Sequence, residues 1–204
     1  MMKVMLFWYL QAQTFYRTLH QEAVSFARVC ENGEKLQWAD VGCGVGLMSH
    51  IADKKGYVVQ SFDLDSDMIS WAKFLNKKNP HLLFAVQDVM ELDSKFDVLS
   101  ATSLLSVVPD RAMVLERLLS LLKNEDSKLI LIEPTETMDV KNVWKMVGSL
   151  KELYYFKMLF VWARARQGKS VDEVIFKDFN NVSHSYVLND MVRITIIGKQ
   201  DEQK

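Results

Sequence analysis

The sequence predicts one α/β domain in which a mostly parallel sheet carries helices on both faces. Three observations lead to this fold class. Short apolar runs alternate with helical patterns between residues 36 and 134, as expected for the strand–helix–strand units of a parallel sheet. A chain of 204 residues is long enough for one domain with additional segments. The composition, 49% hydrophobic and 25% charged residues with 8 glycines and 3 prolines, fits a globular chain and excludes a disordered one.

The N-terminal elements are expected to be helical, because the first thirty residues lack glycine and proline and carry apolar side chains at helical spacing. We expect one or two amphipathic helices there, ending at Asn32 and Gly33. The alternating region then predicts strands at residues 36–41, 57–62, 82–86, 96–101 and 128–133. Between them we expect a helix that ends near residue 54 and helices at 66–76 and 110–122.

The last quarter of the chain predicts a different arrangement. A long helical segment runs from Val140 to about Arg166, and Ser170 and Glu173 have capping-box spacing for a short helix. Strands at residues 182–187 and 191–197 form a hairpin around residues 188–190. We therefore expect a single domain with an N-terminal helical cap (1–31), a core (36–134), a helical insertion (139–169) and a final helix and hairpin (170–198).

The charge balance and the cysteines limit what the chain can bind. Lys and Arg total 25 against 26 Asp and Glu, so the formal charge is -1 and no global field favours nucleic acid. Cys30 and Cys43 are too few for a disulfide framework and lack zinc-site spacing, so we expect no metal site and a reducing, cytoplasmic location. The longest apolar stretch, residues 4–10, is far shorter than the roughly 18 residues that a spanning helix needs.

Three of the eight glycines, Gly42, Gly44 and Gly46, fall in one five-residue window between a predicted strand and a predicted helix. Glycine permits positive φ and close approach of a ligand, and the free N–H groups at a helix start accept negative charge. The window predicts a nucleotide-like ligand, the alternative being a tight turn that binds nothing. A nicotinamide-dependent oxidoreductase is disfavoured, because the pattern G-x-G-x-x-G needs a third glycine where this chain has Leu47.

The segment Asp40-Val41-Gly42-Cys43-Gly44-Val45-Gly46 resembles the D-x-G-x-G-x-G loop of class I S-adenosylmethionine-dependent methyltransferases. The resemblance extends from about Leu36 to Gly198. It implies a Rossmann-like, seven-stranded, mostly parallel sheet with an antiparallel last strand, S-adenosylmethionine as the cofactor, and the two helical segments as a cap. Residues 36–134 would then be the cofactor-binding core.

Asp63 lies at the end of the second predicted strand, 17 residues after Gly46. An ionised carboxylate only accepts hydrogen bonds, so it can bind both hydroxyls of a ribose, and in the family the acid at this point does so. The cofactor contacts that the residues and the resemblance together predict are Asp40, Gly42, Cys43, Gly44, Gly46, Asp63, Leu64, Met68, Asp88, Val89, Ala101, Thr102 and Arg17.

The resemblance implies roles for several of these residues. Leu64 and Met68 would pack on the adenine. Asp88 and the backbone of Val89 would bind the adenine edge, the alternative for Asp88 being a solvated loop carboxylate. The backbone at residues 101–102 would meet the methionine ammonium. Arg17, on the N-terminal helical segment, would pair with the methionine carboxylate, although aromatic and basic residues on such a helix also fit ordinary packing.

The sequence identifies no catalytic base. Relatives often have Glu-His where this chain has Ser106-Val107, so a histidine base cannot be carried over. His20 and His184 are weak candidates because their elements should border the acceptor pocket, although a lone histidine is more often structural or solvated. A sulfonium methyl is already activated, so alignment of the acceptor and exclusion of water can suffice.

The insertion at residues 139–169 is both aromatic and basic, with seven Lys or Arg against two acids. Its aromatic residues are Trp144, Tyr154, Tyr155, Phe156, Phe160 and Trp162. This mixture favours an apolar or acidic acceptor, or contact with an anionic lipid surface. The alternative is a pair of helices that covers the sheet or forms a dimer contact.

These features together predict methyl transfer from S-adenosylmethionine to a small, apolar or lipid-like acceptor by in-line displacement. Nucleic-acid acceptors are not expected, because Ser100-Ala101-Thr102-Ser103 lacks the Asn or Asp followed by Pro-Pro that amino-directed enzymes carry. The main alternative is a non-catalytic module that binds S-adenosylmethionine or a partner. The acceptor, and whether the chain is a monomer or a homodimer, stay open.

Overall fold

The computed structural model describes residues 2–30, 33–79, 81–147 and 150–199, without the side chains of residues 150–155. The predicted helix end at Asn32 and the side chains of Tyr154 and Tyr155 thus lie outside the described residues. The helices are α1 (Met2–Gln11), α2 (Thr14–Ser25), α3 (Leu47–Lys54), α4 (Ser66–Leu75), α5 (Arg111–Ser120), α6 (Val140–Met146), α7 (Leu150–Arg166) and the 3-10 turns η1 (Val89–Glu91) and η2 (Glu173–Phe176). The strands are β1 (Gln37–Val41), β2 (Val58–Asp63), β3 (Leu83–Val86), β4 (Val98–Thr102), β5 (Lys128–Pro134), β6 (Val182–Val187) and β7 (Val192–Gly198).

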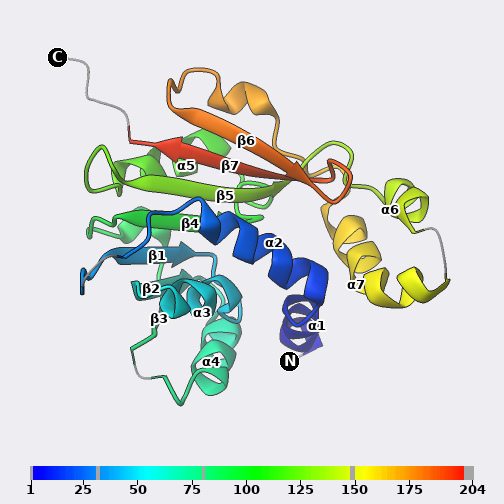
Figure 1. Cartoon of the computed structure of the whole chain (residues 1–204), viewed down its shortest axis with the longest axis horizontal. Helices are drawn as coiled ribbons and strands as arrows, with labels where there is room; N and C mark the ends of the chain where they lie inside the picture. The colour runs from blue at the N-terminus through cyan, green and yellow to red at the C-terminus, as the bar shows by residue number, and fades with distance from the viewer. Residues whose placement is uncertain (1, 31–32, 80, 148–149, 200–204) are drawn as a thin grey trace.

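The strands form one sheet in the order β3-β2-β1-β4-β5-β7-β6. β1 pairs in parallel with β2 and β4, and β7 pairs antiparallel with both β5 and β6 (Figure 1). Since β7 alone is reversed, the prediction of a mostly parallel sheet with an antiparallel last strand is confirmed. The carboxyl ends of the parallel strands meet at one edge, where α1 and α7 also lie in Figure 1. Parallel α/β sheets bind ligands at this edge.

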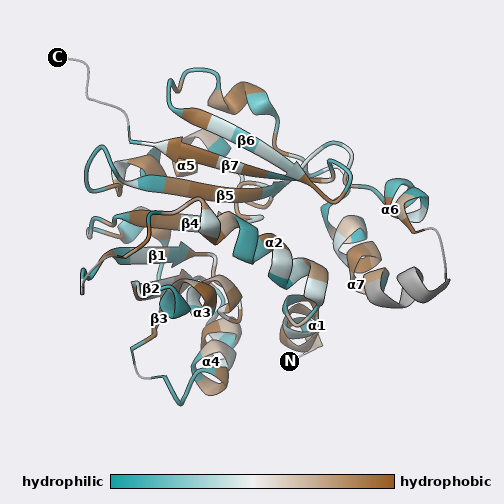
Figure 2. Cartoon of the chain, in the orientation of Figure 1, coloured by the Kyte–Doolittle hydropathy of each residue, from teal (hydrophilic) through white to brown (hydrophobic). Residues whose placement is uncertain are grey.

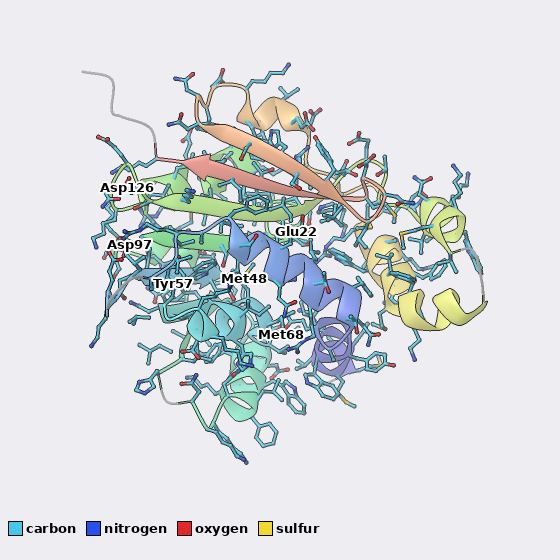
Figure 3. The ribbon with its side chains drawn as sticks, in the orientation of Figure 1. Glu22, Met48, Tyr57, Met68, Asp97 and Asp126 are labelled. Atoms are coloured by element: carbon cyan, nitrogen blue, oxygen red, sulfur yellow. The ribbon has the colours of Figure 1, made fainter. Side chains whose placement is uncertain are left out.

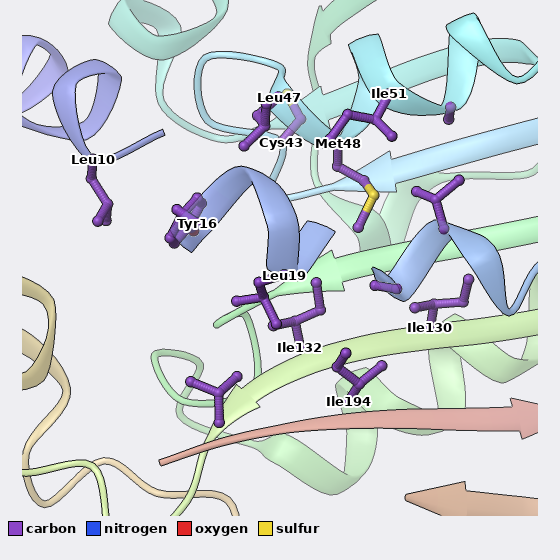
Figure 4. Packing of buried hydrophobic residues seen from close by; sticks show 14 of the residues in the cluster. Leu10, Tyr16, Leu19, Cys43, Leu47, Met48, Ile51, Ile130, Ile132 and Ile194 are labelled. Carbon is purple, nitrogen blue, oxygen red and sulfur yellow. The ribbon is translucent and has the colours of Figure 1, made fainter. Parts of the chain in front are cut away.

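Two apolar layers enclose the sheet. One contains Leu19 of α2, Met48 of α3 and Ile132 of β5, and Figure 4 shows these side chains converging. The other contains Leu118 of α5 and Leu131 of β5. Neighbouring residues of β5 thus point to opposite faces, both buried, which explains the unbroken apolar run in this strand (Figure 2). The helices cover both faces as predicted.

Short polar residues fix where several helices begin. Asp65 accepts hydrogen bonds from the N–H groups of the first turn of α4, and Asp110 accepts one from the N–H of Met113 in α5. The prediction that Ser170 caps the short helix after the insertion is wrong. Asp172 accepts the N–H of Val174 at that place, and the helix is the 3-10 turn η2.

The insertion is a pair of helices, α6 and α7, where the pattern suggested one long segment. Asp139 caps α6 by accepting the N–H of Asn142. The ring of Trp144 in α6 lies 4.8 Å from that of Phe160 in α7, so aromatic contact joins the two helices. Within the part of the chain that the structure describes, no helix is long and apolar enough to cross a membrane.

Candidate functional site

The glycine loop has a backbone that only glycine adopts easily. Gly42, Gly44 and Gly46 have φ angles of 69°, 55° and 89°, in the left-handed region. At Gly46 a Cβ atom would lie 2.8 Å from Cε1 of Phe84, closer than any real contact. The loop therefore turns directly from β1 into the first turn of α3.

Asp40, at the end of β1, holds this loop in place. One carboxylate oxygen accepts the N–H and hydroxyl of Ser49 in α3, at 3.1 and 2.6 Å, and the other accepts the hydroxyl of Ser100 in β4 at 3.0 Å. Burial raises the pKa of Asp40 to about 6, although the two serine hydroxyls oppose the rise. Asp40 also lines the central cavity. Its carboxylate, predicted to contact the cofactor, is engaged mainly in a structural network.

Asp63 and Asp88 lie at the ends of neighbouring strands β2 and β3. Asp63 accepts the N–H of Gly44 at 2.8 Å through one oxygen and the N–H of Asp65 at 2.9 Å through the other. Asp88 accepts the N–H of Met90 through one oxygen. Each carboxylate has further lone pairs, so both can accept hydroxyl or amino hydrogens from a ligand. Val89 beside Asp88 is buried, as is Ala101 at the end of β4.

The residues expected to contact the adenine, Leu64 and Met68, and the expected Arg17 lie in different parts of the structure. Leu64 is 68% exposed, whereas Met68 is buried in a cluster with Val4 of α1 (Figure 3). Arg17 is exposed and lines a separate pocket with His50, on the α3 side of the glycine loop. The structure therefore does not bring Arg17 to the cavity beside Gly42.

A small cavity of about 10 Å³ lies at the ends of β1 and β4, beneath α1 and α2. Its lining residues are Phe7, Gln11, Tyr16, His20, Asp40, Gly42, Cys43, Met48 and Thr102. Helix α1 closes it over the glycine loop, since a Cβ at Gly44 would lie 3.2 Å from atoms of both Phe7 and Gln11. The Gln11 amide oxygen accepts the N–H of Leu47, the first residue of α3, at 3.1 Å.

His20 is the histidine that faces this cavity. Its Nδ1 lies 2.7 Å from the carbonyl oxygen of Tyr16, which can only accept, so Nδ1 carries the proton. Its Nε2 is then an acceptor, 3.2 Å from the hydroxyl of Thr102. Burial lowers the pKa of His20 to about 4, so the ring is neutral at physiological pH.

Aromatic contacts join α2 to α7 beside the cavity. The Tyr16 ring lies 4.4 Å from that of His20 and 5.1 Å from that of Trp162, the latter edge to face. Arg166 follows Trp162 by one turn of α7. Burial raises the pKa of Tyr16. It also raises the pKa of Glu133, which reaches about 8, and the positive charge of Arg166 opposes both increases.

The other histidine candidate lies elsewhere. His184 is on the edge strand β6, where its Nδ1 lies 3.0 Å from the Thr195 hydroxyl and its ring 5.7 Å from that of Phe176. Because β7 separates β6 from β5, His184 does not line the cavity that holds His20 and Thr102. Within the described ranges, no three His, Cys, Asp or Glu side chains are grouped to hold a metal ion.

The sequence alone assigns no definite role at the site to Tyr16, Trp162, Arg166 or Glu133. One signal was present: Tyr16 precedes His20, and Trp162 precedes Arg166, by four residues, so each pair shares a helix face. Which two faces meet depends on tertiary packing, which the pattern does not contain.

The family of the chain follows from its match to known proteins. A family described as a methyltransferase domain matches residues 10–166, which include the glycine loop, Asp63, Asp88 and all of α7. The chain belongs to this methyltransferase domain family. The predicted resemblance to class I S-adenosylmethionine-dependent methyltransferases is thereby confirmed.

Individual relatives agree with this family. The chain is 31% identical over 88 residues to a ubiquinone biosynthesis O-methyltransferase of Coxiella burnetii and 28% identical over 97 residues to one of Hydrogenovibrio crunogenus. These matches cover 41% and 45% of the chain but only 38% and 40% of the relatives, so they span about two fifths of those proteins.

Solved structures confirm the fold. Magnesium protoporphyrin IX methyltransferase from Synechocystis PCC 6803, with bound SAH, superimposes with a TM-score of 0.64 at 16% identity, over 91% of this chain and 84% of that one. The plantazolicin methyltransferase BpumL, in complex with a pentazolic analogue and SAH, superimposes with a TM-score of 0.65 at 16% identity, over 97% and 90%.

Proposed function

We propose that the protein transfers a methyl group from S-adenosylmethionine to a small-molecule acceptor. The observation that carries this proposal is the glycine loop of a methyltransferase domain opening onto a cavity that also holds His20 and Thr102. When bound, S-adenosylmethionine supplies a methyl group on a positively charged sulfur. The residues of this chain would bind the cofactor, orient the acceptor and exclude water, which are the main requirements of such a transfer.

The residues fit the cofactor at several points. Gly42 and Gly44 have positive φ angles and place no side chain between the loop backbone and a ligand, and Asp63 and Asp88 present free lone pairs at neighbouring strand ends. Because Phe7 and Gln11 lie against Gly44, we expect both side chains to move when the cofactor binds. No charged side chain of the cavity lining opposes a cation, since Asp40 is acidic and His20 is neutral.

His20 is the residue we propose to contact the acceptor. Its Nε2 accepts the Thr102 hydroxyl now, and an acceptor hydroxyl entering the cavity could donate to the same lone pair. A pKa of about 4 makes His20 a weak base, so we propose that it orients the acceptor hydroxyl and takes part of its proton as the new bond forms. Its neutrality also avoids repulsion with a sulfonium.

Finer features stay predictions. We propose that α6 and α7 form the acceptor side of the domain, because α7 supplies Trp162 against Tyr16 at the cavity wall. We also propose the division into an N-terminal cap, a core, an insertion and a final hairpin, contact of residues 139–169 with anionic lipid, and a cytoplasmic location. The protein would act as a monomer or a homodimer.

The test begins with cofactor binding. Calorimetry with S-adenosylmethionine, S-adenosylhomocysteine and NAD should show binding of the first two alone. Asp63→Ala should weaken that binding by about 10- to 100-fold, since hydrogen bonds to a charged group contribute about 1.5–3 kcal/mol. Asp67→Ala is the matched control, because Asp67 is an exposed acid four residues away. Binding of NAD alone would overturn the proposal.

Turnover separates an enzyme from a non-catalytic binding module. Transfer of a labelled methyl group to a library of phenols, carboxylic acids and amines should identify an acceptor. His20→Phe should then lower kcat about 10- to 100-fold without changing the affinity for S-adenosylmethionine. Cofactor binding without turnover across the library would favour the non-catalytic module.

A further inference from the structure

The face of α2 that carries Tyr16 and His20 meets the face of α7 that carries Trp162 and Arg166. The geometry points to Arg166 as the residue that binds a carboxylate on the methyl acceptor, which we infer to be a hydroxylated aromatic acid. This inference rests on the proposed methyl transfer and names the acceptor class of the same site.

Spacing along both helices places the four groups together. Tyr16 and His20 are four residues apart on α2, and their rings lie 4.4 Å apart. Trp162 and Arg166 are four residues apart on α7, and the Trp162 ring meets the Tyr16 ring edge to face at 5.1 Å. The contact between α2 and α7 therefore brings the side of α7 that carries Arg166 against Tyr16, which lines the cavity together with His20.

The charge on Arg166 has no partner within the described ranges. Its Nε atom is buried and makes no hydrogen bond, and Arg166 is in none of the ion pairs. The nearby acid Glu133 is already bonded, because its two oxygens accept the N–H groups of Leu105 and Ser106 at 2.8 and 3.3 Å. A buried guanidinium N–H without an acceptor is costly, so an anionic ligand group would satisfy it.

The neighbouring ionisable groups do not neutralise Arg166. Burial raises the pKa of Glu133 to about 8, so this acid is mostly protonated at neutral pH and does not balance Arg166. Arg111 donates to the carbonyl of Ser170, and Arg193 pairs with Glu173 at 3.1 Å. Both of these other arginines are thus engaged elsewhere.

Ser103 gives a second, independent sign of a ligand at this strand edge. Its side chain is 4% exposed, its hydroxyl has no partner, and its φ of 55° is unusual for a residue other than glycine. Strained residues with unsatisfied polar groups concentrate at ligand sites. Ser103 directly follows Thr102, which contacts His20, so the free hydroxyl belongs to the same end of β4.

These groups select the chemistry of the acceptor. The aromatic rings of Phe7 and Tyr16 in the cavity lining favour a flat aromatic body, and His20 favours a hydroxyl as the methylated group. A guanidinium binds a carboxylate through two parallel hydrogen bonds, which fixes both position and orientation. A hydroxybenzoate or hydroxycinnamate carries all three features.

The experiment compares matched acceptors on matched variants. Hydroxybenzoates and hydroxycinnamates are assayed beside their uncharged amides, with the wild type, Arg166→Met, Arg166→Lys and Arg164→Met. Arg164 is the control, because it is an exposed arginine two residues away on the same helix. Arg166→Met should raise KM for the acids about 10- to 100-fold and leave KM for the amides unchanged. Arg166→Lys should recover part of the loss, and Arg164→Met should behave as wild type.

Cofactor affinity distinguishes a failure of the proposed function from a failure of the acceptor inference. Each variant should bind S-adenosylmethionine as tightly as the wild type, which also shows that it is folded. A wild type that does not bind S-adenosylmethionine overturns the proposed function itself. A wild type that binds it but uses the amides as well as the acids, or neither binds nor methylates any of the acids, overturns the acceptor inference alone.

Discussion

Replacement of Gly46 by alanine tests whether the glycine loop is built by steric necessity. Gly46 has a φ of 89°, and a Cβ there would lie 2.8 and 2.9 Å from two ring atoms of Phe84. The left-handed conformation alone costs a non-glycine residue about 1–2 kcal/mol. Overpacking against a buried ring adds about 1–3 kcal/mol. We therefore expect Gly46→Ala to lower the free energy of unfolding by about 2–5 kcal/mol.

Gly168 supplies the control for the backbone contribution. Its φ is 73°, and a Cβ there would meet nothing within 4 Å. Gly168→Ala should therefore lower the free energy of unfolding by only about 1–2 kcal/mol. The difference between the two alanine variants, measured by urea unfolding, isolates the steric contact at Gly46.

A double-mutant cycle identifies the partner in that contact. Phe84→Leu alone should destabilise the protein, because Phe84 is buried in the core. In the Gly46→Ala background the smaller side chain should recover about 1 kcal/mol or more, which appears as a coupling energy between the two positions. Equal losses for Gly46→Ala and Gly168→Ala, or a coupling energy of zero, would refute the steric argument.

Three further predictions concern buried polar groups. Ser103→Gly should raise the free energy of unfolding by about 1 kcal/mol in urea, because it removes a left-handed backbone strain and an unpartnered hydroxyl. Because burial raises the pKa of Glu133 to about 8, its protonated form contributes fully to the free energy of unfolding below about pH 4.5, and this contribution is lost as the pH rises through about 8. We expect the free energy of unfolding to fall by roughly 3–5 kcal/mol across that range, and Glu133→Gln should make this decline smaller. Ser100→Ala should cost about 2–4 kcal/mol in the same assay, since it leaves the Trp38 indole N–H and one Asp40 oxygen without partners; a loss below 1 kcal/mol would contradict this.

The positions of the strands and of the final hairpin could be predicted because local patterns contain most of that information. The apolar run at β5 and the hairpin at residues 188–190 each have a local cause, and both are present in the structure. The turn residues Leu188, Asn189 and Asp190 all have positive φ, which the sequence alone does not require of a leucine. The prediction for the cap of η2 was wrong because Ser170 and Asp172 are both good capping residues, and the local pattern does not choose between them.

The candidate site was predictable only where one segment builds it. Gly42, Gly44 and Gly46 with Asp63 follow from a loop and the end of the next strand, so sequence spacing locates them. His184 and Arg17 failed to reach the cavity because their positions depend on which helix or strand packs where.

The position of Asp40 could be predicted from the sequence, but its bonding partners could not. Sequence placed it next to the cofactor, and it does line the cavity, but its two oxygens bond Ser49 of α3 and Ser100 of β4. Ser49 in turn accepts the hydroxyl of Ser61 in β2, so one buried carboxylate links two neighbouring strands and the helix that begins at the glycine loop. Burial raises its pKa to about 6, so below that pH the carboxyl gains a proton and the charge that orders these donors is lost. The loop geometry that would receive the cofactor thus depends on an acid that need not contact it.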